Sequence, residues 1–180
     1  MIFRRREPQG QSDEDEAGVQ RPPGRLGRLL VPSSILHSSI RGLQGYVPAE
    51  GLCYWFGREV EPGLGLVMVT AFPRIYSSVS SFRLAEGQMS QLTTWSFRAG
   101  VWLLAQVHTH PTDEPHSMAD EEYAPTRREG FISVVIPFGA QFSNLRSPRW
   151  RCFECDANGR WGDAEEGRLS VFDDVWLPES

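Results

Sequence analysis

The chain has 180 residues, of which 40% are apolar and 23% charged, and its formal net charge is −5. These values are typical of one globular domain with a substantial core, and the acidic balance argues against general nucleic-acid binding. No apolar run approaches the roughly 20 residues of a membrane helix, and no apolar stretch follows the arginine run at 4–6, so we expect a cytoplasmic protein without a signal peptide or membrane contact.

Residues 1–24 are predicted to form a disordered N-terminal tail, and residues 25–180 a single domain. The tail contains an arginine run, an acidic run at 13–16 and Pro22-Pro23-Gly24, with few apolar residues. Such a segment buries too little surface to offset the entropy lost on ordering. Folded structure is expected from about Leu29 onward.

The first element expected in the domain is a helix over residues 33–44. Leu36, Ile40 and Leu43 recur at helical spacing and would lie on one face. Ser33 or Ser34 precedes them, and either hydroxyl can cap the first turn.

The remainder of the domain is predicted to alternate between strands and helices. Gly57 is expected to end a strand at 50–56, and Gly100 to end a helix at 84–99. A serine-rich loop is expected to cover residues 76–81. Apolar and aromatic runs bounded by turn residues indicate strands, and helical spacing indicates helices. The expected strands are 50–56, 64–72, 101–107, 131–137 and 150–155 with 160–161, followed by a strand or docked extension at 169–177, and the further helices are 84–99 and one starting at Ser117. This order predicts an α/β (or α+β) fold with a central mixed sheet flanked by helices.

The strongest chemical signal is Val107-His108-Thr109-His110-Pro111. Side chains two residues apart in a strand point to the same face, so His108 and His110 would lie side by side. Two imidazoles at this spacing can bind one metal ion, and Pro111 would place them at the end of the strand.

A zinc site needs at least one further protein ligand, and Asp120 is the best-placed candidate. Asp120 lies three residues after Ser117, which also fits a helix-capping pattern in which the carboxylate serves only the helix. His116 competes as a ligand, but its place next to the cap favours a structural role. Glu50 opens an apolar strand and is the leading candidate for a general base, although a surface glutamate is the simpler interpretation of that residue alone.

Taken together, Glu50, His108-Thr-His110-Pro111 and Ser117-x-x-Asp120 resemble the JAMM signature of the JAB/MPN metallopeptidases. The resemblance covers the chain from about Leu29 onward and is closest between residues 50 and 137. It extends to Phe131-Ile-Ser-Val-Val-Ile-Pro137, which is similar to bacterial members. The gap between His110 and Ser117 is one residue shorter than in many eukaryotic members, which affects the loop more than the ligands.

The resemblance implies a cytidine-deaminase-like fold in which His108, His110 and Asp120 bind Zn²⁺ and Glu50 activates water. It also implies that Ser117 stabilises the oxyanion. The family cleaves peptide or isopeptide bonds after the C-terminus of a ubiquitin-like protein. Short bacterial members accompany activating and conjugating enzymes, in some cases in antiviral defence operons, so these proteins are the expected partners. The substrate tail is expected to bind by strand addition, with residues 76–82 and 111–116 as candidate contacts.

Four alternatives were compared with this interpretation. A metal-free MPN scaffold would usually lack a ligand, and none is missing here. A zinc deaminase needs H-x-E and P-C-x-x-C, and both patterns fail in this chain. A hydrolase that releases a small adduct from a carrier protein would use the same chemistry and stays open. Finally, Cys152-x-x-Cys155 could hold zinc only with two ligands from elsewhere, so we expect an ordinary strand there.

Overall fold

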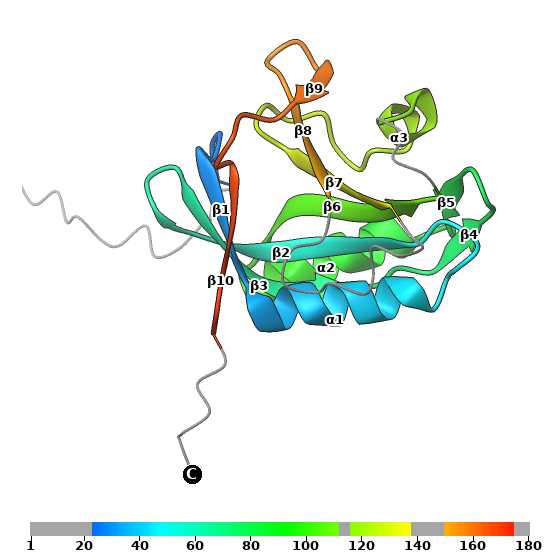
Figure 1. Ribbon diagram of the computed structural model, residues 1–180. Helices are drawn as coiled ribbons and strands as arrows, with labels where there is room; N and C mark the ends of the chain where they lie inside the picture. Colours follow the sequence, from blue (N-terminus) through cyan, green and yellow to red (C-terminus); the bar gives the residue numbers. More distant parts are fainter. Residues whose placement is uncertain (1–22, 112–115, 138–149, 175–180) are drawn as a thin grey trace, which may run out of the picture.

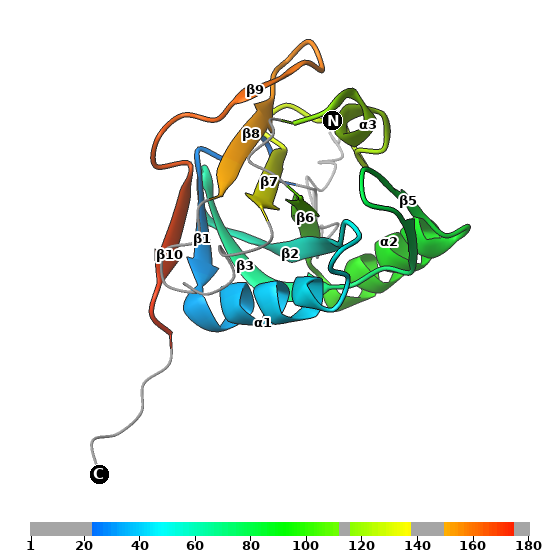
Figure 2. The ribbon, with the colours of Figure 1, turned by 45° about the vertical axis from the view of Figure 1, so that its right-hand side comes forward.

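The computed structural model describes residues 23–111, 116–137 and 150–174. The first 22 residues of the predicted tail and residues 175–177 of the predicted C-terminal extension lie outside this part of the chain. The described residues form a large curled mixed sheet flanked by three helices (Figures 1 and 2). This arrangement confirms the predicted fold class.

The main sheet has eight strands among the described residues. Its order is β10 (Leu169–Phe172), β1 (Arg28–Pro32), β3 (Leu64–Ala71), β2 (Leu52–Glu61), β6 (Trp102–His110), β7 (Ile132–Pro137), β8 (Arg151–Cys155) and β9 (Trp161–Asp163). A small second sheet pairs β4 (Ile75–Ser77) with β5 (Phe82–Leu84). The helices are α1 (Ser33–Gln44), α2 (Gln88–Ala99) and the short α3 (Met118–Glu122).

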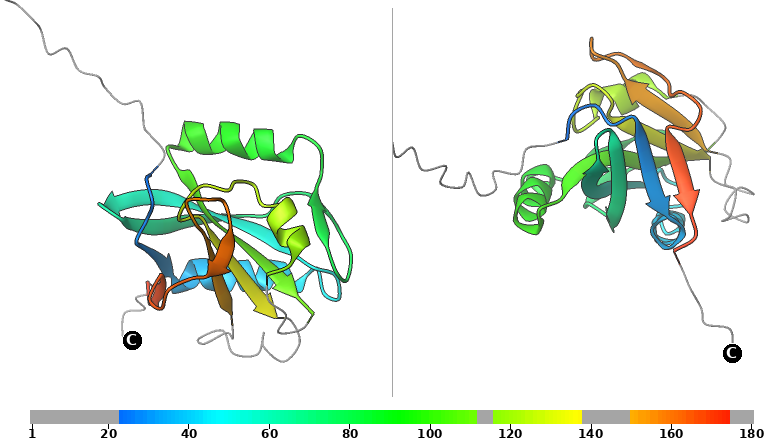
Figure 3. Two further views of the ribbon diagram at one scale, coloured as in Figure 1. Left: turned by 90° about the horizontal axis from the view of Figure 1, so that it is seen from above. Right: turned by 90° about the vertical axis from the view of Figure 1, so that its left-hand side faces the viewer.

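Two hydrophobic clusters form on opposite faces of the main sheet, because successive side chains of a strand alternate between faces. In β2, Cys53 and Trp55 belong to the cluster that includes the apolar side of α1. Tyr54 and Phe56 belong to the other cluster, which is covered by α2 and β5. The two long helices accordingly lie on different sides of the sheet (Figure 3). Among the described residues, no helix is long and apolar enough to cross a membrane.

Helix α1 has the predicted bounds and buries the predicted leucine and isoleucine side chains, but its predicted cap is wrong. The residue at the N-cap position is Pro32, and no side chain of the helix caps the first turn. The carboxylate of Asp174 takes this role instead: it accepts hydrogen bonds from the Ser34 amide at 2.9 Å and the Ser33 hydroxyl at 3.0 Å. The helix start is thus completed from a segment about 140 residues away.

The prediction that Gly57 ends the first strand is also wrong, since β2 continues to Glu61. The pairing of β2 with both neighbours shifts register around Phe56 and Gly57, which marks a bulge. A Cβ atom at Gly57 would lie 1.9 Å from the carbonyl oxygen of Leu66 on β3. The glycine therefore allows close backbone contact within a continuous strand and does not interrupt it.

Three further elements differ from the sequence-based prediction. Residues 28–32, which no pattern indicated as a strand, form β1 between β3 and β10 in parallel pairing with both. The predicted serine-rich loop contributes Tyr76 and Ser77 to β4. Helix α2 starts at Gln88, later than predicted, after Gly87 with φ of 75°. Its predicted end is confirmed, because Gly100 adopts the left-handed conformation with φ of 64°.

Strands β6 and β7 place the candidate site. They run parallel in register, so that His108 pairs with Val135 and His110 with Pro137. The C-terminal ends of two neighbouring parallel strands therefore meet at one edge of the sheet, where ligand sites of α/β folds commonly lie. The antiparallel partner β2 begins at the same edge, with Leu52 opposite His108.

Candidate metal centre

His108 and His110 lie at the C-terminal end of β6, and both are buried. Their rings are on the same side of the strand with centroids 4.9 Å apart. This is the side-by-side arrangement that the two-residue period of a strand requires. Two imidazole side chains are thus available to bind one ion at the sheet edge.

Asp120 approaches both histidines from α3, and it is buried as well. Its Oδ1 lies 3.2 Å from Nε2 of His108, and its Oδ2 lies 3.2 Å from Nε2 of His110. The possible ligand atoms of the three residues all lie within 4.8 Å of one another. We refer to His108, His110 and Asp120 as the His–His–Asp group.

The capping interpretation of Ser117 and Asp120 and the ligand interpretation turn out to be compatible. The Ser117 amide donates to Oδ2 of Asp120 at 2.7 Å, and the Asp120 amide donates to Oγ of Ser117 at 3.2 Å. This is the reciprocal pattern of a capping box. It holds Asp120 in place through one oxygen while both carboxylate oxygens still face the histidines.

The electrostatics of the group favour an ionised Asp120 carboxylate beside a neutral His108 imidazole. Burial by itself would raise the pKa of Asp120, but the two imidazoles and the Ser117 amide outweigh it and hold that pKa well below its usual range. Burial lowers the pKa of His108, an effect that Asp120 opposes only in part. A neutral imidazole and a carboxylate are the protonation states that ligate a metal.

The donor set fits a metal ion. Two imidazole nitrogens and a carboxylate are common ligands of zinc and of other divalent transition metals. A buried carboxylate is also costly unless it is paired or coordinates a metal. The His–His–Asp group could therefore bind a metal ion, and three protein ligands would leave a coordination position for water or substrate.

Glu50 is buried two residues before the start of β2, at the edge of the sheet that carries the histidines. Its amide donates to the carbonyl of Ser78 at 2.8 Å. The next residue, Gly51, is bonded twice to Thr109, which lies between the two histidines: its amide donates to the Thr109 hydroxyl at 2.8 Å, and its carbonyl accepts from the Thr109 amide at 3.0 Å. The backbone next to Glu50 is thus hydrogen-bonded to the strand that carries both histidines. The role of Glu50 as a general base stays a prediction.

Ser117 is exposed at the start of α3. Its Oγ already accepts the Asp120 amide, so its hydroxyl hydrogen is left to point toward a second acceptor. That geometry is compatible with the predicted contact to an oxyanion.

His116 is not part of the His–His–Asp group. Its Nε2 lies 3.1 Å from the hydroxyl of Ser133 on β7, and its ring lies against the rings of Phe153 and Trp161. Burial, together with the neighbouring His108, lowers the pKa of His116 to about 4. The structural role predicted for His116 agrees with these contacts. The contact between Trp161 and His116 was not predicted, because the local pattern of a hairpin strand does not indicate a distant histidine.

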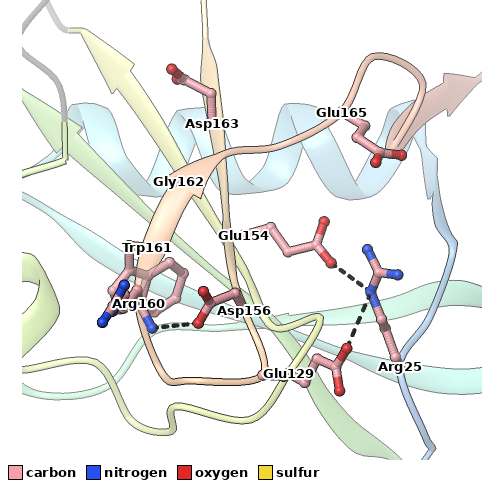
Figure 4. A pocket seen from close by; sticks show the side chains of 10 residues that line it. Arg25, Glu129, Glu154, Asp156, Arg160, Trp161, Gly162, Asp163 and Glu165 are labelled. Atoms are coloured by element: carbon pink, nitrogen blue, oxygen red, sulfur yellow. Dashed lines mark hydrogen bonds and ion pairs between the residues drawn. The ribbon is translucent and has the colours of Figure 1, made fainter.

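A pocket of about 520 Å³ lies beside the β8–β9 hairpin, and the His–His–Asp group does not line it. Its walls carry many charges, as Figure 4 shows. Part of this charge is paired within the wall: Arg25 bonds to Glu154 at 3.0 Å and lies 3.9 Å from Glu129, and Asp156 accepts the backbone amide of Arg160 at 2.8 Å.

Among the described residues, the three cysteines are free thiols, and the His–His–Asp group is the cluster of His, Cys, Asp or Glu side chains that could hold a metal ion. Cys155 is buried on β8, and Cys152 is partly buried three residues before it. The strand expected for this segment is confirmed.

Comparison with known proteins supports a metalloprotease. The chain is 28% identical over 154 residues to a protein of Sinorhizobium fredii (strain NGR234) named "Probable metalloprotease y4jG"; the match covers 81% of this chain and 89% of that protein. No protein-family model matches the chain.

A solved structure shares the fold. The solution structure of protein DSY2949 from Desulfitobacterium hafniense superposes with a TM-score of 0.62 over 82% of this chain and 94% of that one. At 14% sequence identity this likeness concerns the fold alone.

Proposed function

We propose that this protein is a zinc hydrolase of the JAB/MPN type that cleaves the peptide or isopeptide bond after the C-terminus of a ubiquitin-like protein. The observation that carries the proposal is the convergence of His108, His110 and Asp120, with Ser117 bonded to Asp120. The order and spacing of these residues, with Glu50 upstream, resemble the JAMM signature. The similarity to a protein named a probable metalloprotease also supports the reaction class.

His108, His110 and Asp120 would hold the metal ion. Zinc in such a site polarises a substrate carbonyl and lowers the pKa of water to about 7. The chain contributes a buried position with the carboxylate already ionised, so no proton has to be removed from Asp120 when the metal binds.

Glu50 is proposed as the general base and acid of the reaction. Its carboxylate would take a proton from the attacking water and later give a proton to the leaving amine. The bonds between Gly51 and Thr109 hold the backbone next to Glu50 against the strand that carries both histidines. This link supports a fixed separation between the base and the proposed ligands.

Ser117 is proposed to donate a hydrogen bond to the oxyanion that forms when the carbonyl is attacked. Its Oγ accepts the Asp120 amide, which orients the hydroxyl before substrate binds. Donors that are already in place contribute most, because they need no reorganisation in the transition state.

The proposed substrate, a ubiquitin-like protein joined to an amine, follows from the resemblance to the JAB/MPN family. Within that proposal, activating and conjugating enzymes of the same system are the partners. The small β4–β5 sheet lies near the metal ligands, with the Phe82 ring centroid 5.5 Å from that of His108. An extended substrate tail could pair with this sheet by strand addition.

Zinc content and peptidase activity of the purified protein test the proposal together. We expect about one zinc per chain in the wild type, lost in a His108→Ala, His110→Ala double variant that stays folded by circular dichroism. The zinc-loaded wild type should cleave fusions of ubiquitin-like proteins at their C-terminus, and the double variant should not. A wild type that takes up no zinc, even after reconstitution, would leave a scaffold protein with a JAB/MPN fold as the better explanation.

A further inference from the structure

The imidazole of His116 lies among groups from three other elements. Its Nε2 lies 3.1 Å from Oγ of Ser133 on β7. Its ring centroid lies 5.2 Å from that of Phe153 on β8 and 4.7 Å from that of Trp161 on β9, with interplanar angles of 37° and 36°. The rings are tilted against one another, and their separations lie within the 4.5–7 Å range of aromatic contacts.

Two buried polar side chains, Gln106 and Ser133, lie in the sheet next to this histidine. Gln106, Ser133 and Phe153 are cross-strand partners on β6, β7 and β8. The side-chain amide of Gln106 donates to the Ser133 hydroxyl at 3.0 Å, and both residues are fully buried. Buried polar side chains are costly unless they have partners, and the pair provides a fixed hydrogen-bonding group for His116.

The helix that follows His116 cannot hold its own position. Helix α3 has only five residues, and an isolated helix of this length is unstable because nucleation is costly. Its first turn is nevertheless joined to the residue after His116, through the Ser117–Asp120 capping box. Arg127 donates to the carbonyl of Glu121 at 3.2 Å, and His116 anchors the other end, directly before the capping Ser117.

We propose that His116 is a positioning residue for the Ser117–Asp120 turn. Its ring packs against Trp161 and Phe153, and its Nε2 is hydrogen-bonded to Ser133. These contacts hold the turn so that Asp120 faces His108 and His110 before metal binds. This inference rests on the proposed metal site and extends it to the β8–β9 hairpin. Among the described residues, the ring of Trp161 contacts those of His116 and Phe131 and not those of the proposed histidine ligands. It would nevertheless contribute to the affinity of the site for metal.

His116 acts from outside the coordination sphere. Its ring centroid lies 5.9 Å from that of His108, and its Nε2 is engaged with Ser133. The His116 ring also meets the His108 ring edge-on, and the backbone joins His116 to Ser117. Removal of the His116 side chain should therefore loosen Asp120 without removing a ligand.

The test is the dissociation constant for Zn²⁺, measured by competition with a chelator, in full-length wild type and in matched variants. We expect His116→Ala and Trp161→Ala to bind Zn²⁺ about 10- to 100-fold more weakly, the range for groups that orient ligands. His116→Phe and Trp161→Phe keep a ring in the stack and should bind with intermediate affinity. Arg160→Ala changes an exposed residue of the same hairpin and should bind like the wild type.

A second readout locates the effect. Bound Co²⁺ should show a changed visible spectrum in His116→Ala and Trp161→Ala if the position of Asp120 has shifted, and hydrogen exchange of the metal-free protein should accelerate over residues 116–123. If an alanine variant does not fold, the phenylalanine variants decide.

The outcomes separate the two proposals. Wild-type zinc binding with unchanged affinity and Co²⁺ spectrum in all four stack variants would overturn the positioning role alone. A wild type that binds neither metal would overturn the metal site, and this inference with it.

Discussion

The Ser117 amide donates a 2.7 Å hydrogen bond to the same oxygen of Asp120 that faces His110. One carboxylate therefore caps α3 and completes the candidate metal centre. The start of the helix and the third ligand position are consequently determined by one contact. A substitution that removes the charge of Asp120 but keeps the hydrogen bond of the cap can therefore distinguish the two roles.

Replacing Asp120 by Asn should separate the two roles. An asparagine oxygen can still accept the Ser117 amide, so the fold should be retained, whereas the negative charge between the imidazoles is lost. Because groups that only orient ligands contribute about 10- to 100-fold, we expect Zn²⁺ affinity to fall by more than about 100-fold. Chelator competition and circular dichroism measure the two effects, and Glu122→Gln, an exposed change in the same helix, is the control. Unchanged affinity in Asp120→Asn would remove Asp120 from the ligand set.

Glu50→Gln should keep the metal and lose turnover. The amide has nearly the same shape as the carboxylate but cannot take up a proton, and general acid–base catalysis typically contributes about 100- to 10,000-fold. We expect kcat to fall within this range while zinc content remains that of the wild type. Activity on a ubiquitin-like fusion, measured at matched zinc content, gives the answer. A Glu50→Gln enzyme of normal activity would contradict the assignment of the base.

Ser39→Ala should destabilise the fold without touching the candidate site. Ser39 is fully buried on α1, and its hydroxyl accepts the indole N–H of Trp55 at 2.8 Å. Alanine would leave this indole group buried without that partner, at a cost of about 1–3 kcal/mol. Urea unfolding should show the loss at an unchanged denaturant slope. Ser80→Ala, at an exposed position, serves as the control, and equal stability of the two variants would show that the hydrogen bond contributes little.

The stability of the metal-free protein should fall on mild acidification. Burial lowers the pKa of His116 to about 4 in the folded protein, against about 6.5 in an unfolded chain. The unfolded state therefore binds more protons between these values, and the free energy of unfolding decreases as pH falls through that window, by at most about 1.4 kcal/mol per pH unit for one histidine. Above about pH 6.5 this histidine contributes no slope.

His116→Phe provides the comparison for the pH effect. The variant should lose part of the slope but not all of it, since burial also lowers the pKa of His108 in the same direction. Urea unfolding in the presence of EDTA, repeated across the window, measures both proteins. Parallel curves for wild type and variant would show that His116 does not titrate as the structure implies.

A Cys152→Ser, Cys155→Ser double variant should bind as much zinc as the wild type. Burial raises the pKa of Cys152 to about 12 and also raises that of Cys155, so neither thiol readily forms the thiolate that binds metal. The native protein should likewise react slowly with thiol reagents. Loss of zinc in this variant, with the His–His–Asp group intact, would restore the C-x-x-C pair as a metal site.

The candidate site could be predicted because its parts are local in sequence. Two histidines separated by one residue meet on one face of any strand, and Ser117 with Asp120 forms a local capping pattern. Strand β1 was not predicted, for the opposite reason. Its five residues are stabilised by parallel pairing with β3 and with β10, which lies about 140 residues further along the chain.

Gly57 and Trp161 likewise have roles that local sequence patterns do not indicate. Glycine is a common breaker of strands, and only the close approach of the Leu66 carbonyl shows why it is needed inside β2. Trp161 reads as a hairpin residue, and only the folded chain places its ring against His116.

By itself, the sequence determined the fold class, the bounds of α1 and the residue types of a metal site, because strand and helix periods act over a few neighbouring residues. The tertiary structure alone decided that Asp120 meets the two histidines, that Asp174 caps α1 and that the Trp161 ring lies against His116. Each of these contacts joins segments that the chain brings together only when the sheet closes, and the free energy of such contacts depends on burial and geometry that no local pattern contains.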